Sequence, residues 1–291
     1  MAEAAAFEEQ RGRLWGIAYR ITGSVADADD AVQESWLRWE RLPDGVAAEP
    51  RAYLTTTVSR ICYDQLTSAR ARRECYVGIW LPEPVVGEAG PEDRVTLDES
   101  VGTAMLTVME RLTPAERTAF ILHDIFAVPF PEIAEVVDRT PDAVRQLASR
   151  ARRRVRDETP RRTVDRGEHR RAVDAFLTAV TGGDFEALLE ILDPEVVWRS
   201  DGGGRVLAAR LPVVGRAKVA NFIEHLVRGF DPAANPLAVR EVNGAPGLIV
   251  GIPETGSVAV YAFTVHHGRV TAIDASLNPE KLTHLSGGLL P

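Results

Sequence analysis

The sequence predicts a multidomain protein with two all-α units, the second containing a helix-turn-helix, joined by a linker and followed by an α+β domain. Three observations predict this organisation. Apolar residues recur at helical spacing through most of the first 160 residues. A segment rich in Pro and Gly, 76–97, interrupts that pattern. Short apolar runs separated by turn residues follow late in the chain, and its 291 residues suffice for two or three domains.

The first helical unit is expected at residues 1–75. Residues 7–22 carry an apolar stripe, and Ser24 then caps a second helix with an acidic opening and an aromatic end. A third helix, roughly 51–73, places an apolar set inward and ends in arginines. Those arginines are consistent with either a solvated helix end or a nucleic-acid contact. The sequence leaves both open.

The linker is expected at residues 76–97 and contains an apolar motif. Trp80 and Leu81 lie between prolines and glycines. A flexible spacer would leave the Trp ring exposed to solvent, so this segment is predicted to dock onto another surface. Helical character resumes at 98–160, where Thr113 and Glu116 form a capping box.

The strongest local pattern is a helix, a tight turn and a basic second helix over residues 130–157. Thr140 is suited to cap the second helix, and Val144, Ala148 and Ala151 lie on its apolar face. The segment 145–156 contains six arginines and no acidic residue. This pattern favours a helix-turn-helix in a DNA major groove over the alternative, a merely solvated basic face.

The charge distribution supports that interpretation. The net charge is −8, but residues 101–171 alone are net positive, with 14 basic and 11 acidic side chains. Local charge, not the total, sets the attraction to phosphate. The two cysteines are expected to be reduced thiols, no zinc ligand set is present, and neither a signal peptide nor a membrane-spanning run is found. A cytoplasmic protein without a membrane partner is expected.

The C-terminal domain is expected at 165–285, followed by a tail at 286–291. Two helices come first, then a strand near Trp198, a Gly-rich segment read as a flexible turn, and a further helix. Four strands separated by turn residues end the domain. The strands are expected at residues 239–242, 247–252, 258–265 and 270–275.

The order of these pieces resembles a bacterial sigma factor of the extracytoplasmic-function type. The resemblance implies that 1–75 is Sigma-70 region 2, that 98–160 is region 4, and that the partners are promoter DNA and the β and β′ subunits of the RNA polymerase core. It also implies that the acidic helix binds polymerase. Region 2 would melt and read the −10 element, and the loop 42–50 would hold a flipped base. The polymerase-binding residues would be Asp27, Asp29, Asp30 and Glu34, and the −10 residues Tyr53, Ser59, Arg60 and Arg70.

The helix-turn-helix resembles the −35 recognition element of the same family. Arg and Gln side chains near the start of such a helix bond base edges, and later arginines meet phosphates. The resemblance implies −35 contacts by Arg145, Gln146, Ser149, Arg150 and Arg153.

Three further motifs are similar to the signatures of one sigma factor J-like subgroup, whose members carry a C-terminal SnoaL-like domain of the NTF2-like fold, a curved sheet closed by helices into a cone. The last motif has Glu280 where Asp is usual. These interdomain regulatory residues are Trp80, Leu81, Pro82, Glu83 and Pro84; Asp201, Gly202, Gly203, Gly204 and Arg205; and Asn278, Pro279, Glu280, Lys281 and Leu282.

Two functions for the cone compete. An acid and a histidine could act as an acid–base pair, with Asp201, His266, His267 and Asp274 as candidates. The favoured hypothesis is instead non-catalytic, a built-in regulator that contacts the linker and replaces a separate anti-sigma protein. A small-molecule ligand in the cone could favour one regulatory state of the domain. No cofactor is expected. The alternative for the whole chain is a helix-turn-helix regulator with a ligand-binding or catalytic C-terminal domain.

Overall fold

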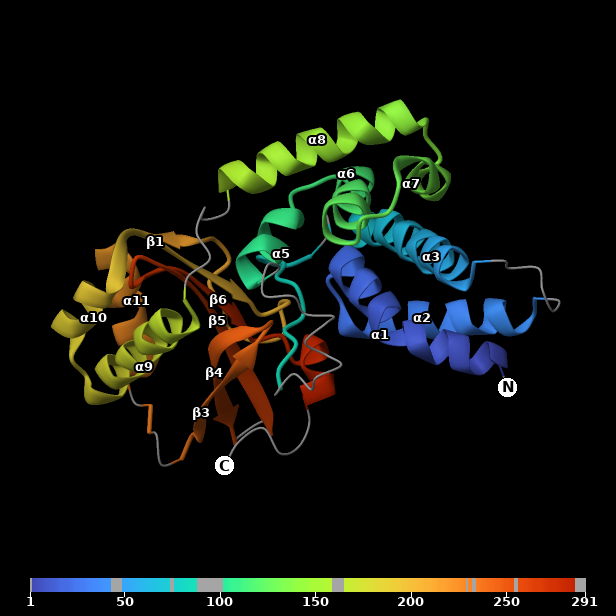
Figure 1. Cartoon of the computed structure of the whole chain (residues 1–291). Coiled ribbons are helices and arrows are strands. Elements are labelled where there is room, and N and C mark those ends of the chain that lie inside the picture. Colours follow the sequence, from blue (N-terminus) through green and yellow to red (C-terminus); the bar gives the residue numbers. More distant parts are fainter. Residues whose placement is uncertain are drawn as a thin grey trace. The chain divides into compact units, whose positions relative to one another are not determined.

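The computed structural model describes residues 2–42, 49–73, 76–87, 102–158, 165–228, 230–231, 234–253 and 256–285 (Figure 1). The chain forms two compact units. The first contains residues 1–75, 90–98 and 105–159, and the second contains residues 76–89, 99–104 and 160–291. The linker from Tyr76 to Ala89 therefore groups with the C-terminal domain. Within the described residues, no helix is long and apolar enough to cross a membrane.

The first unit is all-helical, as expected. Its core is built from the apolar stripes of its helices, with Leu14, Leu54 and Ile133 fully buried. The helices are α1 (Ala2–Thr22), α2 (Val25–Glu40), α3 (Pro50–Arg73), α5 (Thr103–Met109), α6 (Pro114–Phe120), the π-helix η2 (Ile121–Ile125), α7 (Phe130–Val137) and α8 (Pro141–Glu158).

The predicted caps of this unit are confirmed. Ser24 accepts a hydrogen bond from the backbone N–H of Asp27 at 3.1 Å. Thr113 and Glu116 form the reciprocal capping box at the start of α6. Between α7 and α8, Asp138 adopts the left-handed conformation with φ 52°, which ends the first helix and turns the chain. These local signals fix the helix-turn-helix.

The second unit is an α+β domain with a six-stranded sheet in the order β2-β1-β6-β5-β4-β3. Strands β3 to β6 form the expected antiparallel meander, and β1 pairs parallel with β6. The elements are α9 (Arg166–Gly182), α10 (Phe185–Ile191), β1 (Leu192–Asp201), β2 (Val213–Val214), α11 (Arg216–Val227), β3 (Leu237–Val242), β4 (Ala245–Ile252), β5 (Ser257–His266) and β6 (Arg269–Ser276).

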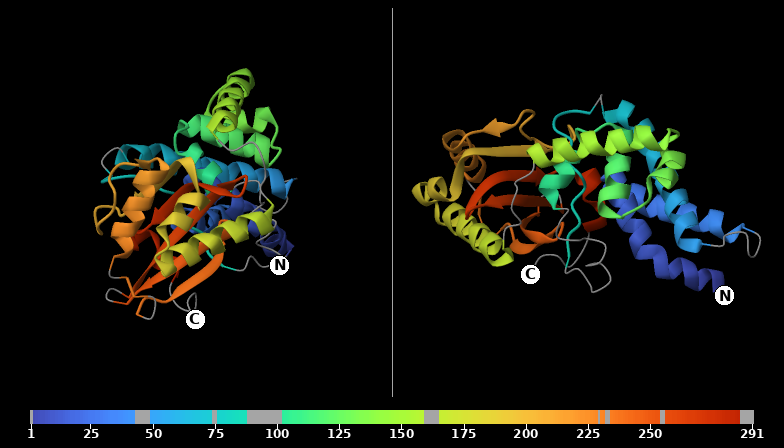
Figure 2. Two further views of the ribbon diagram at one scale, coloured as in Figure 1. Left: turned by 90° about the vertical axis from the view of Figure 1, so that its left-hand side faces the viewer. Right: turned by 45° about the horizontal axis from the view of Figure 1, so that its top comes forward.

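The two faces of this sheet are covered differently. Alternate residues of β5 point to opposite faces, so Phe263 packs in the large core beneath α9, α10 and α11 while Val260 and Ala262 face the other way. On that second face lie the 3₁₀ helices η3 (Pro279–Lys281) and η4 (Thr283–Leu285). Figures 1 and 2 show the three α-helices on one side of the sheet, and Figure 1 shows the linker and these short helices on the other.

The structure differs from the sequence interpretation in three places. The segment Asp201 to Arg205, expected as a flexible turn, packs closely against other residues of the unit. The strand expected near Trp198 is ten residues long, and the two-residue strand β2 was not predicted.

Candidate functional sites

Asp201, at the end of β1, is the centre of a buried cluster that joins the linker to the C-terminal domain. Its carboxylate accepts hydrogen bonds from the Tyr76 hydroxyl at 2.5 Å and from the Leu81 backbone N–H at 2.8 Å. Its backbone carbonyl accepts from the N–H groups of Leu277 and Asn278. Asp201 is fully buried. One residue therefore holds both the linker and the segment that follows β6.

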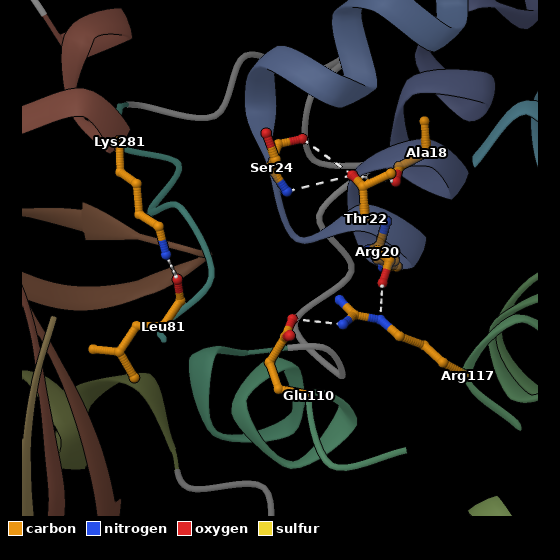
Figure 3. Close-up of polar contacts among 8 residues, drawn as sticks. All are labelled: Ala18, Arg20, Thr22, Ser24, Leu81, Glu110, Arg117 and Lys281. Atoms are coloured by element: carbon orange, nitrogen blue, oxygen red, sulfur yellow. Dashed lines mark hydrogen bonds and ion pairs between the residues drawn. The ribbon is translucent and has the colours of Figure 1, made fainter. Parts of the chain in front are cut away.

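Lys281 supplies the positive charge that this carboxylate needs. Its Nζ lies 2.7 Å from Asp201 Oδ2 and also donates to the Leu81 carbonyl oxygen (Figure 3). The side chain of Lys281 is only 5% exposed, so the ion pair is buried. The aromatic ring of Trp80 lies against the ammonium group, with 3.2 Å from Nζ to the ring centroid. The unexplained Trp of the linker is thus a cation–π partner.

Tyr76 completes the cluster. Its hydroxyl donates to Asp201 and accepts from the Asn278 amide at 2.9 Å. Burial, together with the hydrogen bond to Asp201 and its charge, raises the pKa of Tyr76 well above its ordinary value of 10. The phenol therefore stays protonated and keeps donating at physiological pH.

The glycines after Asp201 allow the linker to approach. Gly203 has φ +58°, and a Cβ there would collide with the Asn278 amide and lie 2.9 Å from the Tyr76 hydroxyl. Gly204, with φ +71°, leaves room for Val77. Arg205 forms an exposed ion pair with Glu280 at 2.5 Å. The three predicted signatures therefore meet, and Glu280 makes its contact in spite of its departure from the usual Asp.

The linker continues as a short β-bridge to the end of the edge strand β3. Val86 pairs antiparallel with Val242 of β3, and the Gly87 N–H donates to the Glu241 carbonyl. Asn243, just after β3, donates its backbone N–H to the Val85 carbonyl and accepts the Val85 N–H on its side chain, both at 2.9 Å. The segment Leu81 to Pro84 is buried between these two attachments.

The helix-turn-helix presents its predicted −35 residues to solvent. Val144, Ala148 and Ala151 are buried, as the pattern predicts. The opposite face is exposed, and several of its arginines contact acids of the same unit: Arg145 pairs with Asp142, Arg150 with Glu116 and Arg152 with Asp124. The exposed residues include Arg145, Gln146, Ser149, Arg150 and Arg153.

The acidic residues predicted to bind polymerase lie along α2. Asp29, Asp30 and Glu34 are exposed and Asp27 is half-buried. Asp29 accepts a hydrogen bond from the Trp15 indole N–H at 2.7 Å. This places an acidic strip on one helix, available to a basic surface.

The predicted −10 residues on α3 divide between solvent and core. Arg60 is exposed and Tyr53 is half-buried beside Trp39. Ser59 is fully buried, with no hydrogen-bond partner for its hydroxyl among the described residues. A contact between Ser59 and DNA stays a prediction that requires this face to open. The side chain of Arg70 and most of the loop 42–50, residues 43–48, lie outside the described residues.

The face of α3 is closed because the helices of the two predicted sigma regions pack together in one unit. Arg13 of α1 donates to the Thr55 hydroxyl of α3 and to the Phe126 carbonyl. Arg117 of α6 is 1% exposed, donates to the Arg20 carbonyl of α1 at 3.0 Å, and pairs with Glu110 (Figure 3). The contact between these helices is therefore partly polar, with the buried Arg117 bonded on both sides.

The candidate catalytic residues do not converge. Asp201 binds Lys281, and Asp274 forms a two-bond ion pair with Arg199. His266 and His267 contact each other at the turn between β5 and β6. Among the described residues, no contact joins either acid to either histidine. A cleft of about 370 Å³ at the ends of α9 and α11 is lined by none of these four.

Two residues that hold the linker, Tyr76 and Asn243, were not predicted from the sequence as functional residues. Tyr76 falls at the first position of the linker, outside the recognised motif. Asn243 belongs to an Asn-Gly pair that signals a hairpin turn, and it does form that turn with φ 51°. Its amide also donates to the Thr103 hydroxyl, 140 residues away in sequence, at 3.0 Å. No local pattern could reveal that bond.

Comparison with known proteins agrees with this arrangement. Residues 6–72 match Sigma-70 region 2, residues 103–155 match Sigma-70 region 4, and residues 173–273 match the SnoaL-like domain. The chain is 43% identical over 297 residues to the ECF RNA polymerase sigma factor SigJ of Mycobacterium tuberculosis, covering 97% of this chain and 93% of the relative. It is 34% identical to the probable ECF RNA polymerase sigma factor SigI of the same species, covering 98% and 97%.

The fold is matched as well. The crystal structure of the M. tuberculosis extracytoplasmic function sigma factor SigJ superimposes with a TM-score of 0.79 at 40% identity, covering 96% of this chain and 98% of the other. Sigma factors bind the RNA polymerase core and direct it to promoter DNA. The chain belongs to the extracytoplasmic-function RNA polymerase sigma factors, with Sigma-70 regions 2 and 4 followed by a SnoaL-like domain of the NTF2-like fold.

Proposed function

We propose that the SnoaL-like domain regulates this sigma factor in cis by holding the linker between regions 2 and 4. The observation that carries the proposal is the buried carboxylate of Asp201, which bonds Tyr76 and Leu81 of the linker and Lys281 of the domain. A carboxylate and an ammonium group are costly to bury unless their hydrogen bonds are made. Here Tyr76 and the Leu81 N–H donate to Asp201, and the Leu81 carbonyl accepts from Lys281. Docking of the linker is therefore part of what makes the buried pair tolerable.

Covalent attachment makes this contact intramolecular. Tethered partners experience effective concentrations on the order of millimolar, so a weak interface suffices for docking. A contact of modest strength also suits a regulator, because a competing partner can displace it. The proposal therefore includes regulation without a separate anti-sigma protein.

The remaining roles follow the sigma architecture. The strip Asp27, Asp29, Asp30 and Glu34 on α2 binds the β′ subunit of the core, with β as the second partner subunit. The exposed residues of α8 read the −35 element, and α3 reads the −10 element with Tyr53, Ser59, Arg60 and Arg70. The support is the exposure of the acidic and basic strips on separate helices.

The SnoaL-like domain is proposed to be non-catalytic. The four candidate acids and histidines do not converge on one site, and the buried His169 of α9 bonds the Pro246 carbonyl of β4. A small-molecule ligand stays a prediction, for which the cleft at the ends of α9 and α11 offers a mixed lining, with Phe185 and Phe230 beside Glu224 and Arg228.

Run-off transcription with purified core polymerase tests the proposal. The full chain is compared with a chain ending at residue 164 and with full-length Asp201→Asn and Trp80→Ala. Arg205→Ala is the control, since its ion pair is exposed and contributes little. We expect Asp201→Asn and Trp80→Ala to change promoter-directed transcription severalfold in the same direction as truncation. Unchanged transcription, with faster amide hydrogen exchange confirming that the linker is released, would contradict regulation by docking.

A further inference from the structure

Asn243 holds both ends of the segment 86–102. At one end, its backbone N–H and its side-chain oxygen bond both backbone groups of Val85 at 2.9 Å. At the other end, its side-chain amide donates to the hydroxyl of Thr103, the first residue of α5, at 3.0 Å. Asn243 is only 5% exposed, and all three residues belong to the second unit. One side chain thus bridges the docked linker and the start of region 4.

The consequence concerns how far region 4 can move from region 2. The chain between α3 and α5 has 29 residues, 74–102, and fully extended it would span about 100 Å at roughly 3.4 Å per residue. The two promoter elements are named for positions about 25 base pairs apart, which is roughly 85 Å at 3.4 Å per base pair. An unrestrained linker therefore covers the required distance easily and tolerates many spacings.

The bonds at Asn243 remove most of that reach. With Val85 and Thr103 held at one residue, the 17 residues of 86–102 contribute nothing to the separation, a loss of roughly 58 Å at 3.4 Å per residue. The 12 residues of 74–85 then span at most about 41 Å, and the two regions themselves must span the rest of the distance. Regions 2 and 4 are packed together in the first unit through Arg13, Arg117 and Phe126. Reading both elements requires these regions to separate, and the attached linker limits the distance.

We infer that Asn243 is a positioning residue that sets the reach of the linker, and so the promoter spacing that this sigma factor accepts. This inference rests on the proposed docking of the linker and adds a second attachment at Thr103. Asn243 suits the role because asparagine tolerates the left-handed conformation, here with φ 51°, and its amide offers one acceptor oxygen and two N–H donors. Neither its turn geometry nor its place in the hairpin requires a bond to Thr103.

The test uses Thr103→Val, which keeps the shape of the side chain and removes the acceptor. Thr103→Ser restores the hydroxyl and is the rescue variant. Asn243→Gly, which tolerates the positive φ and retains the backbone bond to Val85, removes both side-chain bonds. Each full-length variant is assayed with core polymerase on a promoter series whose −35 to −10 spacing is lengthened in single base-pair steps.

We expect Thr103→Val to raise transcription from the longer spacings, relative to the best spacing, by about threefold to tenfold, the effect of losing one net hydrogen bond. Asn243→Gly, which loses two side-chain bonds, should raise it at least as much. Thr103→Ser should retain the wild-type profile. Amide hydrogen exchange should increase at the start of α5 in Thr103→Val while the Leu81 amide, bonded to Asp201, keeps its protection.

An unchanged spacing profile in both Thr103→Val and Asn243→Gly would overturn the inference. The outcome separates it from the proposed function, because Asp201→Asn would then still alter transcription. If Asp201→Asn were also without effect, docking itself would be refuted. A profile altered equally by Thr103→Ser would show a packing effect rather than the hydrogen bond, and would overturn the assignment to Asn243.

Discussion

The ammonium nitrogen of Lys281 lies 3.2 Å from the centroid of the Trp80 ring and 2.7 Å from a carboxylate oxygen of Asp201. A charge so enclosed loses its hydration, and each partner replaces part of it. Lys281→Met should therefore leave Asp201 buried and unpaired, and reduce the free energy of unfolding by about 3–5 kcal/mol. Thermal or urea unfolding measures the effect.

The control for Lys281 is the neighbouring pair of Arg205 and Glu280. Both side chains are more than half exposed, so Arg205→Ala should cost less than about 1 kcal/mol. The double variant Asp201→Asn with Lys281→Met removes both buried charges and should recover part of the stability lost in the single variant. Equal losses of unfolding free energy in Lys281→Met and Arg205→Ala would show that the buried pair contributes no more to stability than the exposed pair.

Gly203→Ala tests the close approach of the linker. The left-handed backbone with φ +58° and the collision of a Cβ with Asn278 both disfavour alanine. Gly183 has a similar φ of +68° with nothing near its Cβ position, which makes Gly183→Ala a matched control. We expect Gly203→Ala to destabilise by about 1–3 kcal/mol more than Gly183→Ala, with faster hydrogen exchange at Leu81. Equal losses would mean that only backbone strain matters.

The recognition helix offers a pair of variants that separates base reading from phosphate binding. Gln146 is exposed near the start of α8 and Arg153 is exposed two turns later. Gln146→Ala should relax specificity at one −35 position by about 1–3 kcal/mol, while Arg153→Ala should weaken binding to all sequences and reduce the salt slope by about 1. Competition binding of holoenzyme at several salt concentrations measures both. A salt slope lowered only by Gln146→Ala would reverse the assignment.

The pH dependence of stability should report on His169. Burial lowers the pKa of this histidine below 6.5, with the hydrogen bond to the Pro246 carbonyl acting in the opposite direction. The unfolded chain therefore binds protons more readily, so the contribution of His169 is complete above pH 6.5 and is lost as the pH falls through the lowered value. Between pH 7.5 and 5, the wild type should lose more unfolding free energy than His169→Gln. Parallel curves for the two proteins would contradict this.

Local chemistry made much of this structure predictable. The cap at Ser24, the capping box at Thr113 and the apolar stripe of α8 are encoded within a few residues, and each forms as expected. The docking of Trp80 was predicted because a large apolar side chain in a linker would otherwise be exposed to solvent. Family resemblance supplied the three motifs, and the structure brings their residues together.

What could not be predicted depends on contacts between distant parts of the chain. The segment from Asp201 to Arg205 looked flexible because glycines permit many conformations, yet here they allow Tyr76 and Asn278 to come close. Ser59 lies on a stripe whose burial follows from the packing of helices beyond its own neighbourhood. The two-residue strand β2 is too short to leave a periodic pattern.

The β-bridge between Val86 and Val242 also covers one end of β3, the outermost strand on this side of the sheet among the described residues. A bare edge readily accepts an extended segment from any source, including the same segment of a second molecule. Release of the linker would open this edge to pairing with another extended segment, so the docked linker also protects the sheet from edge-to-edge association.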